Sequence, residues 1–178
     1  MQEPAASPEP VIRDATPADL GAILRLNEEF VHFLSPLTAA RLGQLHERSA
    51  YHRVACWNGA IAGFLLAFRE GVDYDSPNYR WFAARHPRFL YIDRVVVAGG
   101  AQGNGIGSRL YADLIAFARR CGCERVTCEF DVDPPNPASE RFHHALGFRE
   151  VGRQQVGPSA KTVSLQALPL HTAAGEAT

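Results

Sequence analysis

No long apolar run, no dense cysteine pattern and no excess of one charge occurs in this sequence of 178 residues. A membrane-spanning helix needs about 20 consecutive apolar residues, and no stretch approaches that length, so we expect no membrane partner. Lys and Arg (18) balance Asp and Glu (19), which leaves a net charge of -1. Domains that coat phosphate backbones are normally basic, so nucleic acid is excluded as the main partner.

Cysteine is scarce: the four thiols are Cys56, Cys121, Cys123 and Cys128. The run Cys121-x-Cys123-x4-Cys128 lacks a fourth ligand and the usual spacing of zinc sites, so we expect no metal. Free cysteines pack like small hydrophobic residues, and reduced, buried thiols are expected. The first residues, Met1-Gln2-Glu3-Pro4, show neither the basic start nor the apolar core of a secretory signal. We therefore predict a cytoplasmic protein.

What is present is an ordinary globular composition, with 46% apolar and 21% charged residues. A chain of this length is expected to form one domain, and it can bury a core without disulfides or metals. Residues 1–9 and 171–178 lack an apolar period, so we expect flexible tails around a single domain over residues 10–170.

Periodicity and turn residues predict an α/β fold. A strand, a glycine loop, a helix and a further strand make one parallel pair, and the rest of the sheet is expected to be mostly antiparallel. Residues 70–88 are expected to form a long excursion. The expected strands cover residues 11–14, 52–57, 61–69, 89–98, 125–132, 148–156 and 161–168, and the expected helices begin at Thr16-Pro17, near residue 38, after the glycine loop and at Asn136-Pro137.

Five glycines fall within residues 99–107, between a strand and a helix. Glycine lets backbone N–H groups converge on an anion, and a helix N-terminus adds partial positive charge. The segment therefore predicts a phosphate site; the alternative is a plain glycine turn. A dinucleotide fingerprint is excluded because Ser108 stands where its third glycine belongs, and a nucleotide P-loop is excluded because no Gly-Lys-Ser/Thr follows.

The loop Gln102-Gly103-Asn104-Gly105-Ile106-Gly107 resembles the [RQ]-x-x-G-x-[GA] pyrophosphate loop of the GNAT superfamily of acyl-CoA N-acyltransferases. Tyr91–Val97 is similar to the central strand of that family. The spacing from Asn136 through His143 to Gly147-Phe148 is similar to its N-x-x-[AS]-x-x-x-Y-x-x-x-G-F element. Residues 73–81 further resemble a bacterial subgroup of GNAT acetyltransferases.

The resemblance implies a GNAT fold, with a mixed, mostly antiparallel sheet of six to seven strands, splayed parallel central strands and about four flanking helices. It also implies acetyl-CoA as acyl donor, with its pantetheine arm between strands 89–98 and 124–132. Asn136 would help to seat this donor or would serve as a helix N-cap, and both roles can hold at once. The implied donor-binding residues are Val95, Val96, Val97, Gln102, Gly103, Asn104, Gly105, Ile106, Gly107, Ser108 and Asn136.

By the same resemblance, the activity is N-acetylation of a primary amine by direct transfer from acetyl-CoA in a ternary complex. No cysteine falls at the thioester by motif, which disfavours an acyl-cysteine step. An amine must lose a proton before it attacks, so a carboxylate is expected as base. Asp93 and Glu129 are favoured, and Asp131 is a third candidate. The alternatives are an ion pair of Asp93 with Arg94 and solvated charges on the strand face.

Two residues depart from the family pattern. His143 replaces the tyrosine that many relatives use near the thioester sulfur, and we expect it to protonate the departing thiolate; the alternative is a packing residue. Gly99 replaces a common proline. Because of these departures, a second hypothesis remains: the protein binds acetyl-CoA as a sensor or pseudo-enzyme and does not turn it over.

The implied acceptor site draws on the first two helices and on the segment before the central strand. Its candidates are Phe30, Phe33, Tyr74, Tyr79 and Trp81, whose rings can floor an acceptor pocket or only cover the sheet edge. We expect a small-molecule amine or an amino acid as acceptor. A protein N-terminus or lysine is the alternative, and the assembly is expected to be a monomer or homodimer.

Overall fold

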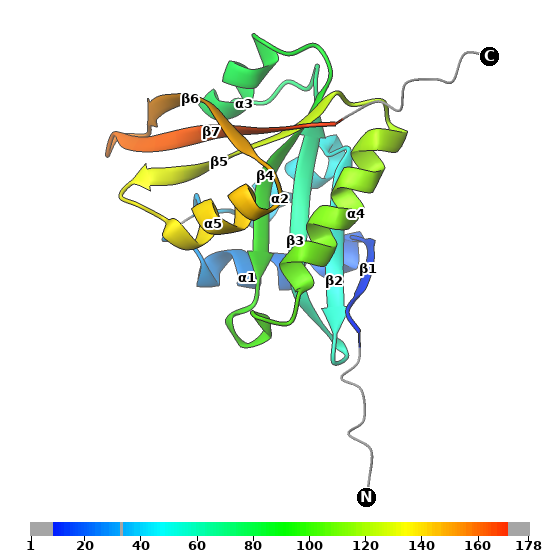
Figure 1. Cartoon of the computed structure of the whole chain (residues 1–178). Helices are drawn as coiled ribbons and strands as arrows, with labels where there is room; N and C mark the ends of the chain where they lie inside the picture. Colours follow the sequence, from blue (N-terminus) through cyan, green and yellow to red (C-terminus); the bar gives the residue numbers. More distant parts are fainter. Residues whose placement is uncertain (1–8, 33, 171–178) are drawn as a thin grey trace, which may run out of the picture. The chain divides into compact units, whose positions relative to one another are not determined.

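The computed structural model describes residues 9–32 and 34–170. Phe33 and the predicted tails, residue 9 excepted, lie outside the described residues. Figure 1 labels the elements. The strands are β1 (Val11–Asp14), β2 (Tyr51–Trp57), β3 (Ala60–Arg69), β4 (Phe89–Val97), β5 (Arg125–Asp133), β6 (Arg149–Val156) and β7 (Lys161–Pro169). The helices are α1 (Leu20–Glu29), α2 (Ala39–Arg48), α3 (Pro77–Ala83), α4 (Ile106–Arg120) and α5 (Pro137–Ala145), with 3-10 turns at Pro17–Asp19 and Gly99–Ala101.

The seven strands of the described residues form one sheet, in the order β1-β2-β3-β4-β5-β7-β6. β4 and β5 are parallel, whereas β1–β2, β5–β7 and β6–β7 are antiparallel pairs. The glycine loop and α4 connect the two parallel strands, as the sequence predicts. The α/β fold class with its mixed sheet is therefore confirmed.

By its internal contacts the chain forms two compact units. Unit 1 contains the described residues up to Leu66 together with Arg94–Asp113, and unit 2 contains Ala67–Asp93 and the described residues from Leu114 onward. β3, β4 and α4 are each divided between the units. The single domain over residues 10–170 stays a prediction.

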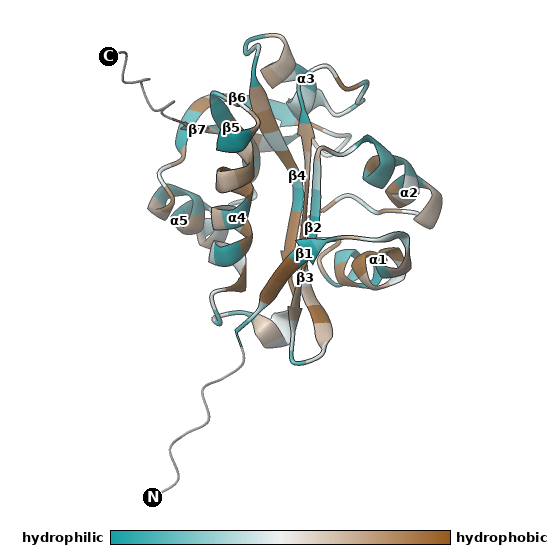
Figure 2. Ribbon diagram, turned by 90° about the vertical axis from the view of Figure 1, so that its right-hand side faces the viewer, coloured by the Kyte–Doolittle hydropathy of each residue, from teal (hydrophilic) through white to brown (hydrophobic). Residues whose placement is uncertain are grey.

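Unit 1 is layered. Figure 2 shows its strands between α1 and α2 on one side and the first turns of α4 on the other. Its buried cluster contains Ile23 and Leu26 of α1, Leu42 of α2, Val54 of β2 and Phe64 of β3. Each helix contributes one apolar face to this core, which is what an amphipathic helix on a sheet requires.

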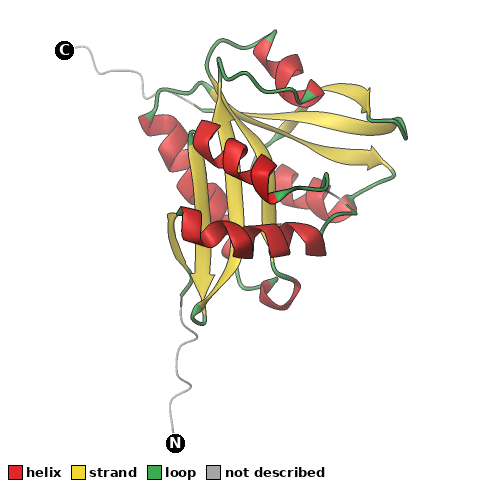
Figure 3. Ribbon diagram, turned by 180° about the vertical axis from the view of Figure 1, so that it is seen from behind, coloured by secondary structure: helices red, strands yellow, loops and turns green. Residues whose placement is uncertain are grey.

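Unit 2 is built on β5, β7 and β6, with α3 and α5 on different faces of these strands (Figures 1 and 3). Neighbouring residues of a strand point to opposite faces, so α3 covers the face of β5 that carries Glu129, and α5 covers the face that carries Phe130. Inside this unit the pairing of β4 with β5 runs from Phe89↔Arg125 to Tyr91↔Thr127. β5 continues to Asp133, so the two strands part after this short ladder.

Helix α3 lies inside residues 70–88, where the sequence analysis predicts only a long excursion. Ser76 caps the helix by accepting a hydrogen bond from Tyr79 N at 3.3 Å. Pro77 follows in the first turn, where its missing N–H is tolerated. The Tyr79 hydroxyl donates to Arg69 O at 2.7 Å and so fixes the helix to the end of β3.

Among the described residues, no helix is long and apolar enough to cross a membrane. No group of three or more His, Cys, Asp or Glu side chains in that part of the chain is placed to hold a metal ion. The four cysteines are free, and Cys123 and Cys128 are buried. Burial raises the pKa of the Cys128 thiol well above its usual range, which makes this thiol a poor nucleophile.

Candidate functional site

The glycine loop lies in unit 1, between the end of β4 and the start of α4. Exposed residues 102–105 lead into the helix, which begins at Ile106. Gly103 and Gly105 have φ angles of 79° and 74°. Residues with a Cβ rarely adopt this left-handed backbone, so the path of the loop requires glycine at both positions.

The backbone of this loop has open space beside it. A Cβ added at Gly103 or Gly105 would meet no described protein atom within 4 Å. Asn104 Nδ2 donates to Ala101 O and Gln102 O at 3.1 and 3.2 Å, which holds the loop from within. The first N–H groups of an α-helix have no acceptor inside the helix, so together with the glycine backbone they could hold an anion; that role stays a prediction.

The first turn of α4 combines packing with exposure. Ile106 is buried, Gly107 is half-buried and Ser108 is exposed. Arg109 N donates to Gly105 O at 3.0 Å, which begins the helical ladder directly after the loop. The turn is therefore anchored by Ile106 while its N-terminal end stays accessible.

The end of β4 carries three valines of different exposure. Val96 is 3% exposed and belongs to the unit 1 core, whereas Val95 and Val97 are half-buried. A Cβ at Gly63 would lie 2.8 Å from Val96 O, so glycine permits the close approach of β3. Val97 O accepts a hydrogen bond from Gln102 Nε2 at 3.2 Å, which ties the strand end to the loop.

Other predicted residues of unit 1 have packing or structural contacts. Phe30 is half-buried against the unit 1 core, and Phe33 lies outside the described residues. Arg94, the expected ion-pair partner of Asp93, donates to Asn27 Oδ1 at 2.9 Å and to Ser35 O at 3.0 Å. These bonds fix the guanidinium beside α1.

Unit 2 contains a carboxylate held by neutral donors. The Tyr91 hydroxyl donates to Glu129 Oε1 at 3.0 Å, and the Asn78 side chain hydrogen-bonds to the same carboxylate. Glu129 Oε2 is buried and has no hydrogen-bond partner among the described residues. A buried oxygen without a partner is unfavourable until a ligand or a proton reaches it, so Oε2 is the candidate proton acceptor of unit 2.

The surroundings of Glu129 shift its ionisation toward neutral pH. Burial, followed by the negative charge of Asp93, raises the pKa of Glu129 to about 8. The hydrogen bonds from Asn78 and Tyr91 act in the opposite direction, because they favour the ionised form. A carboxyl group that titrates near the working pH can both take and release a proton, as a general base must.

The two other carboxylates have partners of their own. Asp93 accepts a hydrogen bond from the Tyr74 hydroxyl at 2.5 Å. Asp131 forms an ion pair with Lys161 at 2.8 Å. The structure thus brings Asp93 and Glu129 together and distinguishes them by their contacts; which of the two is the base stays a prediction.

His143 lies on α5, away from the Glu129 face of β5. It is 5% exposed, and its ring centroid lies 5.6 Å from that of Phe130. Nδ1 is 2.7 Å from Ser139 O; because a carbonyl only accepts, Nδ1 carries the proton of the neutral ring and Nε2 does not. Burial lowers the pKa of His143. The predicted role as proton donor requires the imidazolium, the form that burial disfavours.

Asn136 begins α5. Its Oδ1 accepts a hydrogen bond from Ser139 N at 3.2 Å, and its own N–H donates to Asp131 O at 3.1 Å. The N-cap role that the sequence offers is therefore present. A contact of Asn136 with an acyl donor stays a prediction.

The aromatic acceptor candidates of unit 2 belong to α3 and to the segment before it. Tyr74 is 7% exposed and Tyr79 2%, and the two rings pack with their centroids 5.7 Å apart. Trp81 is half-buried over Gly152, where an added Cβ would lie 2.6 Å from the ring. These contacts dock α3 on the sheet; contact with an acceptor stays a prediction.

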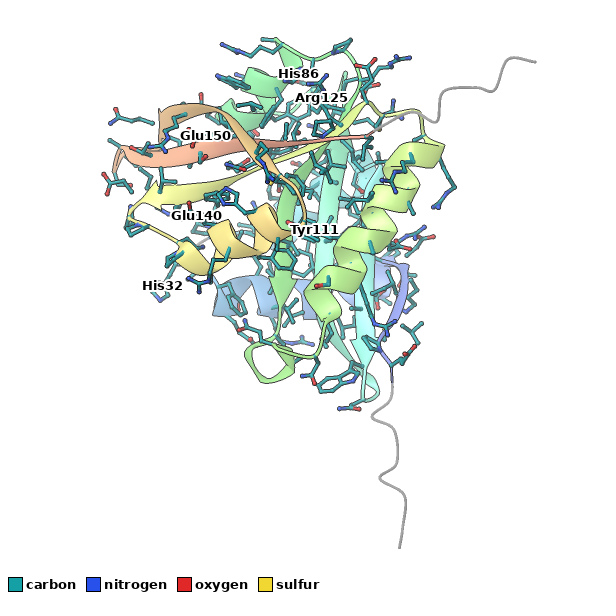
Figure 4. The ribbon with its side chains drawn as sticks, in the orientation of Figure 1. His32, His86, Tyr111, Arg125, Glu140 and Glu150 are labelled. Carbon is teal, nitrogen blue, oxygen red and sulfur yellow. The ribbon has the colours of Figure 1, made fainter. Side chains whose placement is uncertain are left out.

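The histidines without a motif lie outside the Glu129 cluster. His32 is exposed. Figure 4 shows His86 near Arg125. Burial lowers the pKa of His86, and the positive charge of Arg125 lowers it further. His46 and His52 approach each other with their Nδ1 atoms 2.8 Å apart. The hydrogen bonds described for Glu129 involve none of these rings.

Sequence reasoning misses the amides that hold Glu129 in place. Gln154 Nε2 donates to Asn78 Oδ1 at 2.5 Å, across 76 residues of sequence. The pair Ser76-Pro77 is a local signal that a helix begins there and that Asn78 stands in its first turn. Nothing local indicates that Gln154, on β6, reaches the same amide.

The chain matches a known protein family over most of its length. Residues 20–148 match the Acetyltransferase (GNAT) family. This span includes the glycine loop, the carboxylates of β4 and β5, and His143.

Two curated bacterial enzymes and one solved structure are similar over much of the chain. L-methionine sulfoximine/L-methionine sulfone acetyltransferase of Salmonella typhimurium is 26% identical over 146 residues, which cover 71% of this chain and 84% of that enzyme. Aminoglycoside N(6')-acetyltransferase type 1 of Serratia marcescens is 28% identical over 103 residues, 57% of this chain and 66% of that enzyme. The structure of yncA, a putative acetyltransferase from Salmonella typhimurium with its cofactor acetyl-CoA, aligns with a TM-score of 0.71 at 26% identity, covering 92% of this chain and 95% of that chain.

Proposed function

The chain belongs to the acetyltransferase (GNAT) family, and from this premise we propose that it moves an acetyl group from acetyl-CoA to the primary amine of a small molecule by direct transfer in a ternary complex. The observation that carries the proposal is the Glu129 carboxylate, whose Oε2 is buried without a partner among the described residues. Relatives named for small acceptors and a relative solved with acetyl-CoA support it.

The residues of unit 1 fit acetyl-CoA as acyl donor. Gly103 and Gly105 leave open space beside a left-handed backbone, and the N–H groups of Gln102–Ser108 would hold the pyrophosphate. Backbone groups of Val95 and Val97 would pair with the pantetheine arm. When bound, acetyl-CoA supplies an acetyl group on a thioester, whose C–S bond breaks as the C–N bond to the acceptor forms.

Glu129 acts as the general base in this proposal. An acceptor amine with a pKa of about 10 is an ammonium at neutral pH and has no lone pair with which to attack. Oε2 takes one N–H proton, directly or through one water, and the freed electron pair forms the C–N bond. The nitrogen then loses its second excess proton, and the departing thiolate gains one from solvent, so one proton is released overall.

The contacts of unit 2 favour a small acceptor over a protein chain. Helix α3, with Asn78 in its first turn, covers the Glu129 face of β5, and Tyr74, in the segment before this helix, bonds to Asp93. Cys128 is not a candidate carrier of the acetyl group, because its buried thiol has a raised pKa. Direct transfer to a compact amine agrees with both features.

The test is release of CoA thiol from acetyl-CoA with a panel of acceptors: L-methionine sulfone, other L-amino acids, an aminoglycoside and a peptide with a free N-terminus. We expect turnover with a small amine well above hydrolysis. Glu129→Gln should lower kcat/KM by about 10²–10⁴-fold, with no change in the Kd for acetyl-CoA. Wild-type kcat/KM in a folded Glu129→Gln protein would remove Glu129 as the base.

Asp131→Asn is the matched variant, because Asp131 lies on the same face of β5 and already forms an ion pair with Lys161. We expect its kcat/KM to stay within about threefold of wild type, because the Asp131 charge is paired with Lys161 and has the smallest effect on the pKa of Glu129 among the neighbouring groups. Acetyl-CoA binding without turnover on any acceptor of the panel would instead support a sensor.

A further inference from the structure

Two strings of hydrogen bonds end on the Glu129 carboxylate in unit 2. In the first, the Ser76 hydroxyl bonds to the Tyr91 hydroxyl, and Tyr91 donates to Glu129 Oε1 at 3.0 Å. In the second, Gln154 Nε2 donates to Asn78 Oδ1 at 2.5 Å, and Asn78 bonds to the carboxylate. Ser76 and Asn78 both stand at the start of α3, so this helix contributes to both strings.

The direction of the second string follows from the chemistry of its members. An ionised carboxylate only accepts, so Asn78 presents its NH2 to Glu129 and its Oδ1 to the other side. Oδ1 then needs a donor, and the NH2 of Gln154 provides it. A protonated Glu129 would compete as a donor, so the string stabilises the ionised carboxylate.

The charges around Glu129 oppose its ionisation. Asp93 of β4 and Asp131 of β5 carry like charges, and burial removes water from the carboxylate. Asp93 bonds to Tyr74, and Asp131 pairs with Lys161 of β7. The hydrogen-bond partners described for Glu129 itself are neutral groups, so their orientation decides how readily it gives up its proton.

We propose that Asn78, oriented by Gln154, is a positioning residue of the transfer reaction, which favours the ionised form of Glu129 and leaves Oε2 as the oxygen that receives the proton of the acceptor amine. This inference rests on the proposed role of Glu129 as base. It gives α3 a function beyond covering the sheet, through a polar residue of its first turn.

A purely structural Asn78 would behave differently. Helix α3 has a separate apolar anchor, because Trp81 packs over Gly152. If Asn78 only linked α3 to β6, its substitution would change the melting temperature and lower the rate equally at every pH. Loss of a residue that stabilises the ionised form of Glu129 instead changes the pH at which the rate begins to rise.

The decisive variant is Gln154→Glu, which keeps the length of the side chain and replaces its donor by an acceptor. Asn78 must then turn its NH2 toward β6 and its Oδ1 toward Glu129, which favours the protonated base. We expect the midpoint of the acid limb of kcat/KM to move up by about one pH unit, the size of a hydrogen bond to a charged group. At the alkaline plateau the rate should stay within about threefold of wild type.

The profile is measured from pH 6 to 10 at saturating acetyl-CoA, with L-methionine sulfone or, where the panel gives a better acceptor, with that acceptor. The matched control is Gln155→Glu, which adds the same charge to the exposed neighbour on β6. Its acid limb should stay within about 0.2 pH units of wild type, because an exposed charge is screened by solvent.

Asn78→Asp provides a second, near-isosteric variant, checked for folding by its melting curve. It removes the donor and adds a third like charge, so the acid limb should move up by more than in Gln154→Glu. An unshifted limb in both folded variants, with Glu129→Gln inactive, overturns this inference alone. A fully active Glu129→Gln protein overturns the base itself, so the two failures are distinguishable.

Discussion

The glycine loop of unit 1 is built from backbone groups, whereas the Glu129 network of unit 2 is built from side chains. The loop uses backbone N–H groups of consecutive residues, and its special positions, Gly103 and Gly105, lack a side chain altogether. The network uses side chains of β4, β5, β6 and α3, and its longest link joins Asn78 to Gln154 across 76 residues. A backbone site is specified by local sequence, whereas a side-chain network is specified only once the fold has formed.

This difference predicts opposite responses to substitution. An added Cβ damages the loop without touching the core, because nothing described lies within 4 Å of it. In the network the same change displaces packed neighbours, and exchange of one polar atom alters the chemistry.

The largest effect is expected for Gly105→Val in the loop. At a φ of 74° a β-branched residue is strained, and its side chain would fill the space next to the predicted anion site. We expect the Kd for acetyl-CoA to rise by about 100-fold, or about 2.7 kcal/mol, with a melting curve that remains cooperative. Isothermal titration calorimetry with acetyl-CoA measures the change.

The control is Gly59→Val in the β2–β3 turn of the same unit. Gly59 also has a positive φ, 78°, and open space around its Cβ position, so the backbone strain is comparable while no ligand is expected there. Its Kd should remain at the wild-type value. Equal affinities of the Gly105→Val and wild-type proteins would mean that the loop is not the pyrophosphate site.

The next effect is expected for Gly152→Ala in unit 2. The new Cβ would lie 2.6 Å from the Trp81 ring, so α3 must shift, and overpacking of this kind destabilises by about 1–3 kcal/mol. We expect kcat/KM to fall as well, with an unchanged Kd for acetyl-CoA. Urea unfolding gives the stability.

Gly43→Ala on α2 is the matched control, since nothing lies within 4 Å of its Cβ position. This change should stabilise the protein by up to about 1 kcal/mol, the usual advantage of alanine over glycine in a helix. Similar stabilities of the two variants would show that Trp81 does not hold α3 on β6.

What could be predicted from the sequence follows the same division. The order of strands along the chain, the parallel crossover and the Asn136 cap depend on residues close in sequence, and the structure agrees with these predictions. Helix α3 also has a local signal, Ser76-Pro77, but the aromatic and polar residues around it show no helical period, so the sequence predicts only an excursion there. The roles of Asn78 and Gln154 could not be predicted, because they depend on which side chains the fold brings together across several elements.

A smaller effect is expected on stability: Glu129→Gln should stabilise the folded protein although it lowers the activity. The pKa of Glu129 is about 8 in the folded protein and 4.5 is its ordinary value, so between these pH values the folded protein holds a proton that the unfolded chain releases. Wild-type stability therefore falls as pH rises from about 4.5 to 8. Glutamine removes this loss and should raise the melting temperature by several degrees at pH 8.5.

The gain should shrink toward pH 5, where both proteins carry a neutral group at this position. Differential scanning calorimetry at the two pH values measures it. A gain of equal size at pH 5 and pH 8.5 would show that packing, and not an ionised carboxylate, is responsible. Such a result would separate the stability of unit 2 from the titration of Glu129.

The smallest effect is expected at His143, where the hydrogen-bond pattern leaves no proton on Nε2 of the neutral ring. Because the pKa of His143 is lowered by burial, the imidazolium is already scarce at pH 7, so the rate should not depend on it from pH 7 to 9. His143→Asn keeps an N–H for Ser139 O and removes the distal nitrogen; its kcat should stay within about threefold of wild type, below the 10²-fold that general acid catalysis usually contributes. His144→Ala, on the exposed side of α5, is the control for changes in this helix. A kcat of His143→Asn that falls by about 100-fold, with the deficit widening toward low pH, would restore His143 as the acid that protonates the thiolate.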